Sequence, residues 1–182
     1  MTHSSIPILG FAGWSGAGKT TLIKQLIPRL IQKKIQLSII KHAHHSFDVD
    51  YPGKDSYLFR KAGARQTLLA SHHRWVLMDE HLHDQEPDLF ELIERIDKTL
   101  IDLILVEGFR DISFPKMEVY RPALGKALLC ENDEHIFALL TDQPITLKRH
   151  IPILDLNDLN TICQFVVDWV ESSLISNREN SK

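Results

Sequence analysis

The chain begins with a short apolar run, a glycine-rich stretch and then a longer run with helical spacing. Residues 6–12 (IPILGFA) are almost all apolar and predict a buried strand. After residue 18, apolar side chains recur every three or four positions over about three turns, which is typical of a helix with one buried face. Pro28 lies inside this pattern and has no backbone N–H, so we expect a kink or an early end of the helix there.

Buried strands and amphipathic helices continue to alternate along the rest of the chain. Strands are predicted at residues 37–41, 66–70, 74–78, 103–109, 116–120 and 136–140, and helices at residues 56–62, at 88–96 and from Asp158 onward. The second and third of these strands should form a pair joined by a short turn. Residues 116–120 alternate between polar and apolar side chains, so we expect an edge strand. This order predicts an α/β fold of three layers with a largely parallel central sheet, plus an added antiparallel hairpin or edge strands.

Composition limits the class of protein. The 182 residues fit one domain, which we expect over residues 1–175, followed by a disordered tail at 176–182. A net charge of -3 argues against nucleic acid or an anionic membrane as the main partner. Apolar runs reach only about six residues, too few to span a bilayer. Cys130 and Cys163 form no CxxC pair and the first residues lack a basic leader, so we expect a cytoplasmic protein.

The glycine-rich stretch (GWSGAGKT) fits the pattern G-x-x-x-x-G-K-[ST] between a predicted strand and a predicted helix. Glycines keep the backbone bare, so that several N–H groups can converge on a phosphate chain, and the start of the helix adds unpaired N–H groups. Lys19 supplies charge for the β and γ phosphates, and the Thr20 hydroxyl is a ligand for Mg²⁺. The predicted nucleotide-binding residues are Gly13, Trp14, Ser15, Gly16, Ala17, Gly18, Lys19, Thr20 and Thr21.

Carboxylates at strand ends are the candidate metal ligands and catalytic groups. Glu107 directly follows the apolar run at 103–106, where P-loop proteins more commonly carry Asp. Asp50 lies in the polar loop after the second strand, which should face the triphosphate because such loops line the ligand crevice of an open α/β sheet. We therefore assign Asp50 and Glu107 as catalytic and, with Thr20, as Mg²⁺ ligands, and Lys54 as a nucleotide contact. The alternatives are a capping carboxylate at Glu107 and solvated charges in the loop.

Two further features bear on a transition-metal site and on recognition of the nucleotide base. Histidines 42, 44 and 45 admit a transition-metal site, but we expect ordinary polar loop residues because no cysteine or helical His spacing accompanies them. The guanine-reading pattern N-K-x-D is absent. Asp142, in TDQP after a predicted strand, stands where that pattern would lie. Its carboxylate can accept from the N1–H and N2–H₂ groups of guanine, or it can be a plain turn residue.

Three segments resemble one family: FAGWSGAGKTTL, IKHAHHSFDVDYPGKDSYLFRKAGA and DLILVEGF are similar to the MobB family of molybdopterin-guanine dinucleotide biosynthesis adapter proteins. The resemblance runs from about Ile6 to Trp169. It implies a P-loop NTPase fold, GTP with Mg²⁺, and a homodimer joined through extended β-structure. It also implies a guanylyltransferase partner that attaches GMP to molybdopterin, with molybdopterin or molybdoenzyme apoproteins as further partners.

The resemblance also carries over to individual positions. Besides the phosphate loop and Glu107, the positions that match the family are Lys41, His42, Asp50, Lys54, Asp55 and Ser56. Arg110 stands where a lysine is expected after E-G-F, which keeps the charge.

Three functions remain open at the level of sequence. The first is a GTP-binding adapter with slow hydrolysis, because residues 42–55 contain neither Gln nor Arg to act on the γ-phosphate. The second is a small-molecule kinase, in which Arg60, Lys61 and Arg65 would form a lid. The third is a metal-delivery GTPase that uses the histidine-rich loop.

Overall fold

The computed structural model describes residues 6–43, 47–81, 83 and 86–179. The chain folds into two compact units, one made of residues 1–42 together with 89–182 and the other of residues 43–88. We name them the main unit and the insert unit and describe each by itself. The insert unit contains the strand pair that the sequence predicts as an addition to the sheet.

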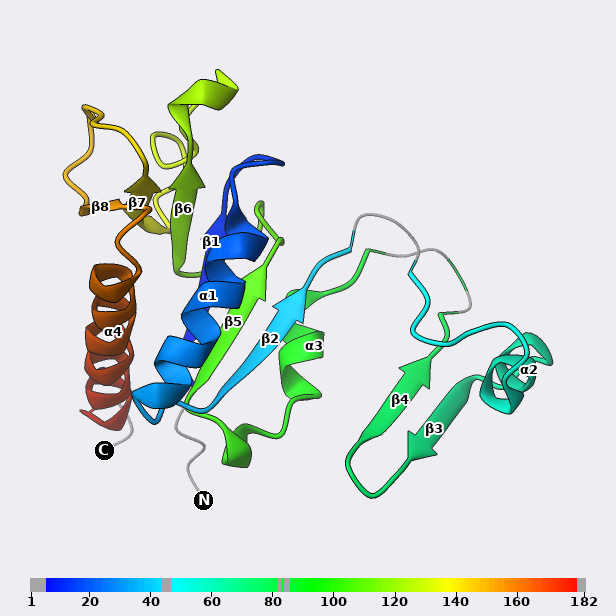
Figure 1. The fold of residues 1–182 in the computed structure, drawn as a ribbon. Helices are drawn as coiled ribbons and strands as arrows, with labels where there is room; N and C mark the ends of the chain where they lie inside the picture. Colours follow the sequence, from blue (N-terminus) through cyan, green and yellow to red (C-terminus); the bar gives the residue numbers. More distant parts are fainter. Residues whose placement is uncertain (1–5, 44–46, 82, 84–85, 180–182) are drawn as a thin grey trace. The chain divides into compact units, whose positions relative to one another are not determined.

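The main unit is built on a six-stranded sheet in the order β2-β5-β1-β6-β7-β8, and all neighbouring strands are parallel (Figure 1). The strands are β1 (Ile8–Ala12), β2 (Leu37–Lys41), β5 (Leu103–Glu107), β6 (Lys116–Tyr120), β7 (Ile136–Thr141) and β8 (Ile153–Asp155). The predicted parallel sheet is confirmed. The sequence pattern does not reveal β8, because this strand has three residues and two of them are exposed.

Helices cover both faces of this sheet and complete the predicted three layers (Figure 1). Helices α1 (Lys19–Gln32) and α4 (Leu159–Glu179) pack on one face, where Leu105 of β5 is buried with them. Helix α3 (Leu89–Glu94) packs on the other face, against Ile104 and Val106 of the same strand. Because β5 is buried on both faces, it reads in the sequence as an unbroken apolar run. Two short 3₁₀ turns, Lys98–Leu100 and Pro122–Leu124, lie in the connections.

Helix ends differ from the prediction in three places. Helix α1 continues four residues past Pro28, because the proline is exposed while Leu30 beyond it is fully buried and anchors the last turn. Helix α3 ends at Glu94, two residues early. Helix α4 begins as predicted, with the Asp158 carboxylate accepting from the backbone N–H of Thr161 at 3.0 Å. It extends to Glu179, so residues 176–179 of the expected tail are helical, and residues 180–182 lie outside the described part.

Strand β6 is not the edge strand that its alternating polar residues suggest, because it lies between β1 and β7. Its Lys116 is only 1% exposed. The ammonium donates to the carbonyl oxygens of Arg110 at 2.8 Å and Ile112 at 2.7 Å, and lies 2.7 Å from a carboxylate oxygen of Asp133. Three acceptors thus compensate the buried charge and fasten the loop that follows β5.

The second buried polar residue of β6, Glu118, fastens the next loop. Its carboxylate is fully buried and accepts from the backbone N–H groups of Leu129 at 2.9 Å and Cys130 at 2.8 Å. Burial raises the pKa of Glu118, while these two hydrogen bonds act in the opposite direction. Lys116 and Glu118 therefore fix the loops on both sides of β6, and both loops pass close to the glycine-rich stretch.

The insert unit consists of α2 (Asp55–Lys61) and the antiparallel hairpin of β3 (Gln66–Ala70) and β4 (Trp75–Asp79). The predicted strand pair is thus confirmed. Within the residues that the structure describes, no helix of either unit is long and apolar enough to cross a membrane.

We expect Lys116→Ala to lower the free energy of unfolding by about 3 kcal/mol, because it leaves the buried acceptors of the ammonium without a partner. Denaturant unfolding followed by circular dichroism measures the change. Lys98→Ala is the matched control. It removes a lysine from a surface ion pair with Glu94 and should cost less than about 0.5 kcal/mol. Equal effects of the two substitutions would contradict a stabilising role for the buried lysine.

Candidate functional site

The loop between β1 and α1 adopts a backbone that only glycines accommodate easily. Gly13, Gly16 and Gly18 have positive φ angles of 141°, 82° and 101°. A Cβ atom on Gly13 would lie 2.3 Å from the carbonyl oxygen of Val119 in the neighbouring strand. Within the part of the chain that the structure describes, no side chain caps the first turn of α1. The free N–H groups of that turn are therefore left for a ligand.

The Lys19 side chain folds back over the loop and binds its backbone. Its ammonium donates to the carbonyl oxygens of Gly13 at 2.7 Å and Trp14 at 3.0 Å. Burial lowers the pKa of Lys19, and the charges of Arg110 and Lys41 lower it further, while the carboxylate of Glu107 acts against them. The loop thus concentrates positive charge that an anion would stabilise.

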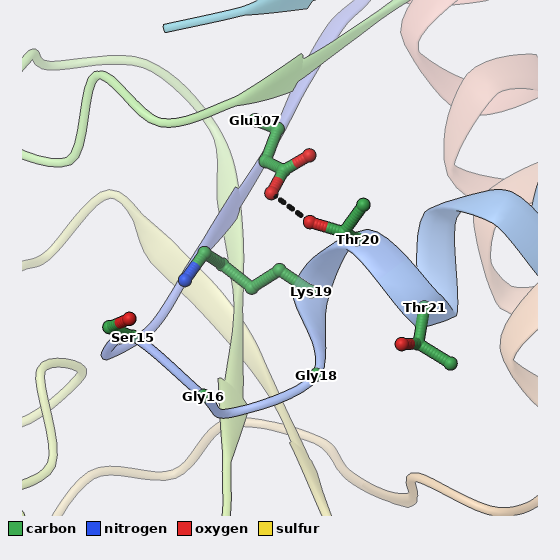
Figure 2. A pocket seen from close by; sticks show the side chains of 7 residues that line it. All are labelled: Ser15, Gly16, Gly18, Lys19, Thr20, Thr21 and Glu107. Carbon is green, nitrogen blue, oxygen red and sulfur yellow. Dashed lines mark hydrogen bonds between the residues drawn. The ribbon is translucent and has the colours of Figure 1, made fainter. Parts of the chain in front are cut away.

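A cavity of about 340 Å³ opens above the loop. Figure 2 shows its lining, formed by Ser15, Gly16, Gly18, Lys19, Thr20, Thr21 and Glu107. Every lining group other than glycine carries a hydroxyl, an ammonium or a carboxylate. Such a lining suits a phosphate chain better than an apolar ligand.

Thr20 and Glu107 present oxygen atoms to one point of the cavity. The Thr20 hydroxyl donates to Oε1 of Glu107 at 2.5 Å (Figure 2). The parallel register brings the ends of β1, β2 and β5 to one edge of the sheet, where Glu107 is the Cα partner of both Phe11 and Lys41. The Lys41 ammonium lies 3.5 Å from Oε2 of Glu107. A hydroxyl and a carboxylate are the hard oxygen ligands that Mg²⁺ prefers, so these residues fit the ion that the fold implies.

His42 lies beside the backbone of Glu107. Its backbone N–H donates to the carbonyl oxygen of Glu107 at 2.8 Å, and its ring stacks on Phe109 with centroids 4.7 Å apart. Gly108 allows this approach, because a Cβ atom there would lie 2.6 Å from Cβ of His42. The E-G-F segment therefore holds Lys41 and His42 next to the predicted strand-end acid.

Cationic groups surround the loop, and two of them, Arg121 and Lys126, are not predicted by the sequence. The indole N–H of Trp14 donates to the carbonyl oxygen of Ala127 at 2.8 Å. The Trp14 ring centroid is 5.1 Å from Cζ of Arg110 and 5.7 Å from Nζ of Lys126. Arg121 donates from Nε to the carbonyl oxygen of Ala17 at 3.1 Å. Arg121 and Lys126 are more than 100 positions from the loop, so no local pattern reveals them.

The predicted site residues fall into three groups. The glycine-rich loop and Glu107 meet in one cavity. Asp142 lies at the end of β7 and forms an ion pair with Arg121, which links it to the loop. Asp50 and Lys54 belong to the insert unit, so their placement at the triphosphate stays a prediction. There, Oδ1 of Asp50 accepts from the backbone N–H of Tyr51 at 2.9 Å.

The histidines of the polar loop give no metal centre in the described residues. His44 and His45 lie outside the part of the chain that the structure describes. Among residues 6–43, 47–81, 83 and 86–179, no group of three or more His, Cys, Asp or Glu side chains could hold a metal ion.

Comparison with known proteins decides the family. The family model described as "Molybdopterin guanine dinucleotide synthesis protein B" matches residues 8–142, which include the glycine-rich loop, Glu107 and Asp142. This chain belongs to the MobB family. The resemblance of the three sequence segments is thereby confirmed, and the fold agrees with it.

Curated relatives and solved structures extend the match beyond these residues. A molybdopterin-guanine dinucleotide biosynthesis adapter protein of Escherichia coli is 47% identical over 169 residues, or 91% of this chain and 94% of the relative. A protein of the same name from Haemophilus influenzae is 41% identical, with 92% of each chain covered. The solved structure of Bacillus subtilis MobB superposes with a TM-score of 0.71 at 25% identity and covers 90% of this chain and 97% of its own.

We expect Glu107→Gln to spare triphosphate binding at saturating Mg²⁺ but to lower the apparent Mg²⁺ affinity by about tenfold, because a charged oxygen ligand becomes neutral. Calorimetric titrations of nucleotide at several Mg²⁺ concentrations measure this. Asp102→Asn is the matched control at the opposite end of β5, where the carboxylate accepts from the backbone N–H of Gln36. Glu107 would be only a structural cap if both variants responded to Mg²⁺ like the unmodified protein.

Proposed function

We propose that this chain is an adapter protein of molybdopterin-guanine dinucleotide biosynthesis that binds GTP with Mg²⁺. In this role it assists the guanylyltransferase that attaches GMP to molybdopterin, in the cytoplasm. The observation that carries the proposal is the polar cavity in which Lys19, Thr20 and Glu107 converge above bare loop amides. Family membership adds the pathway, because the relatives that match over nearly their whole length carry the adapter name.

Each group of the cavity has a defined task in this proposal. The free N–H groups at the start of α1 donate to the phosphate oxygens, and Lys19 moves its hydrogen bonds from loop carbonyls to the β and γ phosphates. Thr20 and Glu107 hold Mg²⁺, which neutralises the charge of the phosphates when bound. Asp50 and Lys54 are proposed to act at the γ-phosphate, because the loop after β2 is expected to face the triphosphate.

Asp142 is proposed to read the base. Its Oδ2 pairs with Arg121, while Oδ1 is buried and has no hydrogen-bond partner among the residues that the structure describes. A buried acceptor without a donor costs free energy, and a ligand donor would recover it. Guanine offers two donors on one edge, N1–H and N2–H₂, whereas adenine offers an acceptor at N1. The carboxylate therefore favours GTP over ATP.

Hydrolysis is proposed to be slow. Efficient GTPases place an arginine on the transferring phosphoryl group and hold the attacking water with a side chain such as Gln. Arg121 is committed to Ala17 and Asp142, and the guanidinium of Arg110 lies over the Trp14 ring. A long-lived GTP complex suits an adapter that signals the bound state to a partner.

The kinase alternative is less well supported. A kinase would use Arg60 and Arg65 over the phosphates. Arg60 already contacts carboxylate oxygens of Asp48 at 2.8 Å and Glu80 at 3.0 Å, and Arg65 lies 3.2 Å from a carboxylate oxygen of Asp79. Both arginines thus stabilise the insert unit itself, so we prefer the adapter.

The hairpin of the insert unit is the proposed homodimer interface. Leu68 and Leu77 are cross-strand partners, as are Ala70 and Trp75, and the strand period places both pairs on one face. On this face Leu68, Trp75 and Leu77 are 63%, 70% and 44% exposed. A two-stranded sheet with an exposed apolar face is marginal alone, and its outer edges offer unpaired backbone groups. A second copy of the chain would cover the apolar face and pair with an outer edge of the hairpin. This agrees with the extended β-structure that the family resemblance implies.

We expect Leu77→Glu to convert the protein from dimer to monomer, because it buries a charge in the proposed apolar interface. Light scattering after size-exclusion chromatography measures the mass. Leu100→Glu, which alters a leucine of the main unit that is even more exposed than Leu77, should leave the dimer intact. The interface would be elsewhere if Leu77→Glu stayed dimeric, and the homodimer itself is contradicted if the unmodified protein is monomeric.

The test of the function is reconstitution with the purified guanylyltransferase, molybdopterin, GTP and Mg²⁺. We expect the unmodified chain to increase the rate of dinucleotide formation and Lys19→Ala to lose this effect, because losing a charge-assisted hydrogen bond weakens GTP binding by more than about tenfold. Lys24→Ala, on the exposed side of α1, is the control and should behave as the unmodified chain. No stimulation by the unmodified chain, or full stimulation by Lys19→Ala, would contradict the proposal.

A further inference from the structure

We propose that Arg121 is a positioning residue for base selection, which couples the phosphate loop to the carboxylate of Asp142. The proposal rests on the proposed binding of GTP and names the group that orients its base reader. Arg121 contributes no predicted motif of its own, and its role follows from contacts made at the junction of β1, β6 and β7.

The sheet register brings the two residues together. Tyr120 of β6 is the Cα partner of Thr141 of β7, so Arg121 and Asp142 are the next residues on two adjacent parallel strands. Pro122 follows immediately and starts a 3₁₀ turn that Arg121 caps, with the Leu124 N–H donating to the Arg121 carbonyl at 3.0 Å. The backbone at Arg121 is therefore fixed by the strand on one side and the turn on the other.

The guanidinium reaches in two directions at once. Nε–H donates to the carbonyl oxygen of Ala17 in the phosphate loop at 3.1 Å, and one terminal nitrogen pairs with Oδ2 of Asp142. The other terminal nitrogen lies 3.6 Å from the Cβ position of Gly18, so the guanidinium is in van der Waals range of the end of the phosphate loop. The planar guanidinium holds its N–H groups at fixed positions that match both acceptors, whereas the compact ammonium of a lysine does not reproduce that spacing.

This bridge determines how Asp142 is presented. A carboxylate free at both oxygens rotates about its last torsion and loses that freedom when a base binds. With Oδ2 held by Arg121, the orientation of Oδ1 is set before binding, and Oδ1 is the buried atom without a partner among the described residues. Because the same guanidinium holds Ala17, the spacing between phosphate loop and base reader is set as well. Arg121 thus pre-organises two subsites of one ligand.

Base selectivity separates this role from a simple charge effect. If Arg121 were only one more cation beside the triphosphate, its loss would weaken all nucleoside triphosphates alike. If it orients Asp142, its loss should weaken GTP more than ITP, which lacks the 2-amino donor, and more than ATP. The preference for GTP over ITP is therefore the informative quantity, and a merely structural role would not move it.

The experiment compares the affinities of GTP, ITP and ATP for the full chain in saturating Mg²⁺. We expect Arg121→Ala to reduce the GTP/ITP preference by about tenfold, while ATP affinity changes less than about threefold. Arg121→Lys should show nearly the same loss of preference. Lys126→Ala is the matched control, because it removes a cation next to Trp14 in the same loop without touching Asp142, and it should retain the preference.

The outcomes separate the two proposals. If the unmodified chain binds GTP, ITP and ATP equally, base reading by Asp142 fails and this inference fails with it. If the unmodified chain prefers GTP and Arg121→Ala keeps that preference, only the role of Arg121 is overturned. Should Arg121→Ala not fold, Arg121→Lys decides the question: a lost preference supports the bridge, and a retained one contradicts it.

Discussion

The turn from β1 into α1 has positive φ angles at Gly13, Gly16 and Gly18 and no space for a side chain at Gly13, and the rest of the site depends on this constraint. The carbonyl oxygen of Val119 excludes a Cβ atom at Gly13, so the loop passes close to β6 before it turns into the helix. That path points free amides and the Lys19 ammonium into one cavity. The sheet register then places Glu107 opposite Thr20, so that a single strand order assembles the proposed phosphate and metal contacts.

Two buried charged side chains, Lys116 and Glu118, fix the loops that surround the phosphate loop. Lys116 and Glu118 occupy β6 in the middle of the sheet, yet each is fully engaged with the loop on one side of the strand. One loop carries Arg110 and the other carries Lys126 and Ala127, and both meet at Trp14. Burying charge is costly unless it is paired, so these contacts specify the position of both loops rather than simply adding stability.

Contiguous patterns predicted most of the fold and the centre of the site, while contacts between distant segments were missed. The phosphate loop is a local motif, and Glu107 ends an unbroken apolar run, so both could be recognised. The alternating polar and apolar residues of β6 led to the wrong prediction of an edge strand, because polar side chains usually face water. Lys116 and Glu118 are instead buried and paired with groups in the core. Arg121 could not be predicted, because its task depends on the register of β6 and β7. The placement of Asp50 depends on the insert unit, which forms a body of its own.

The central claim is that the glycine-rich loop holds GTP together with Mg²⁺. Isothermal titration of GTP into the purified chain, with and without Mg²⁺ and with ATP in parallel, tests this claim most directly. The account predicts one GTP per chain, binding that weakens when Mg²⁺ is removed, and weaker binding of ATP. Absence of GTP binding in the presence of Mg²⁺, or equal affinity for ATP, would contradict it.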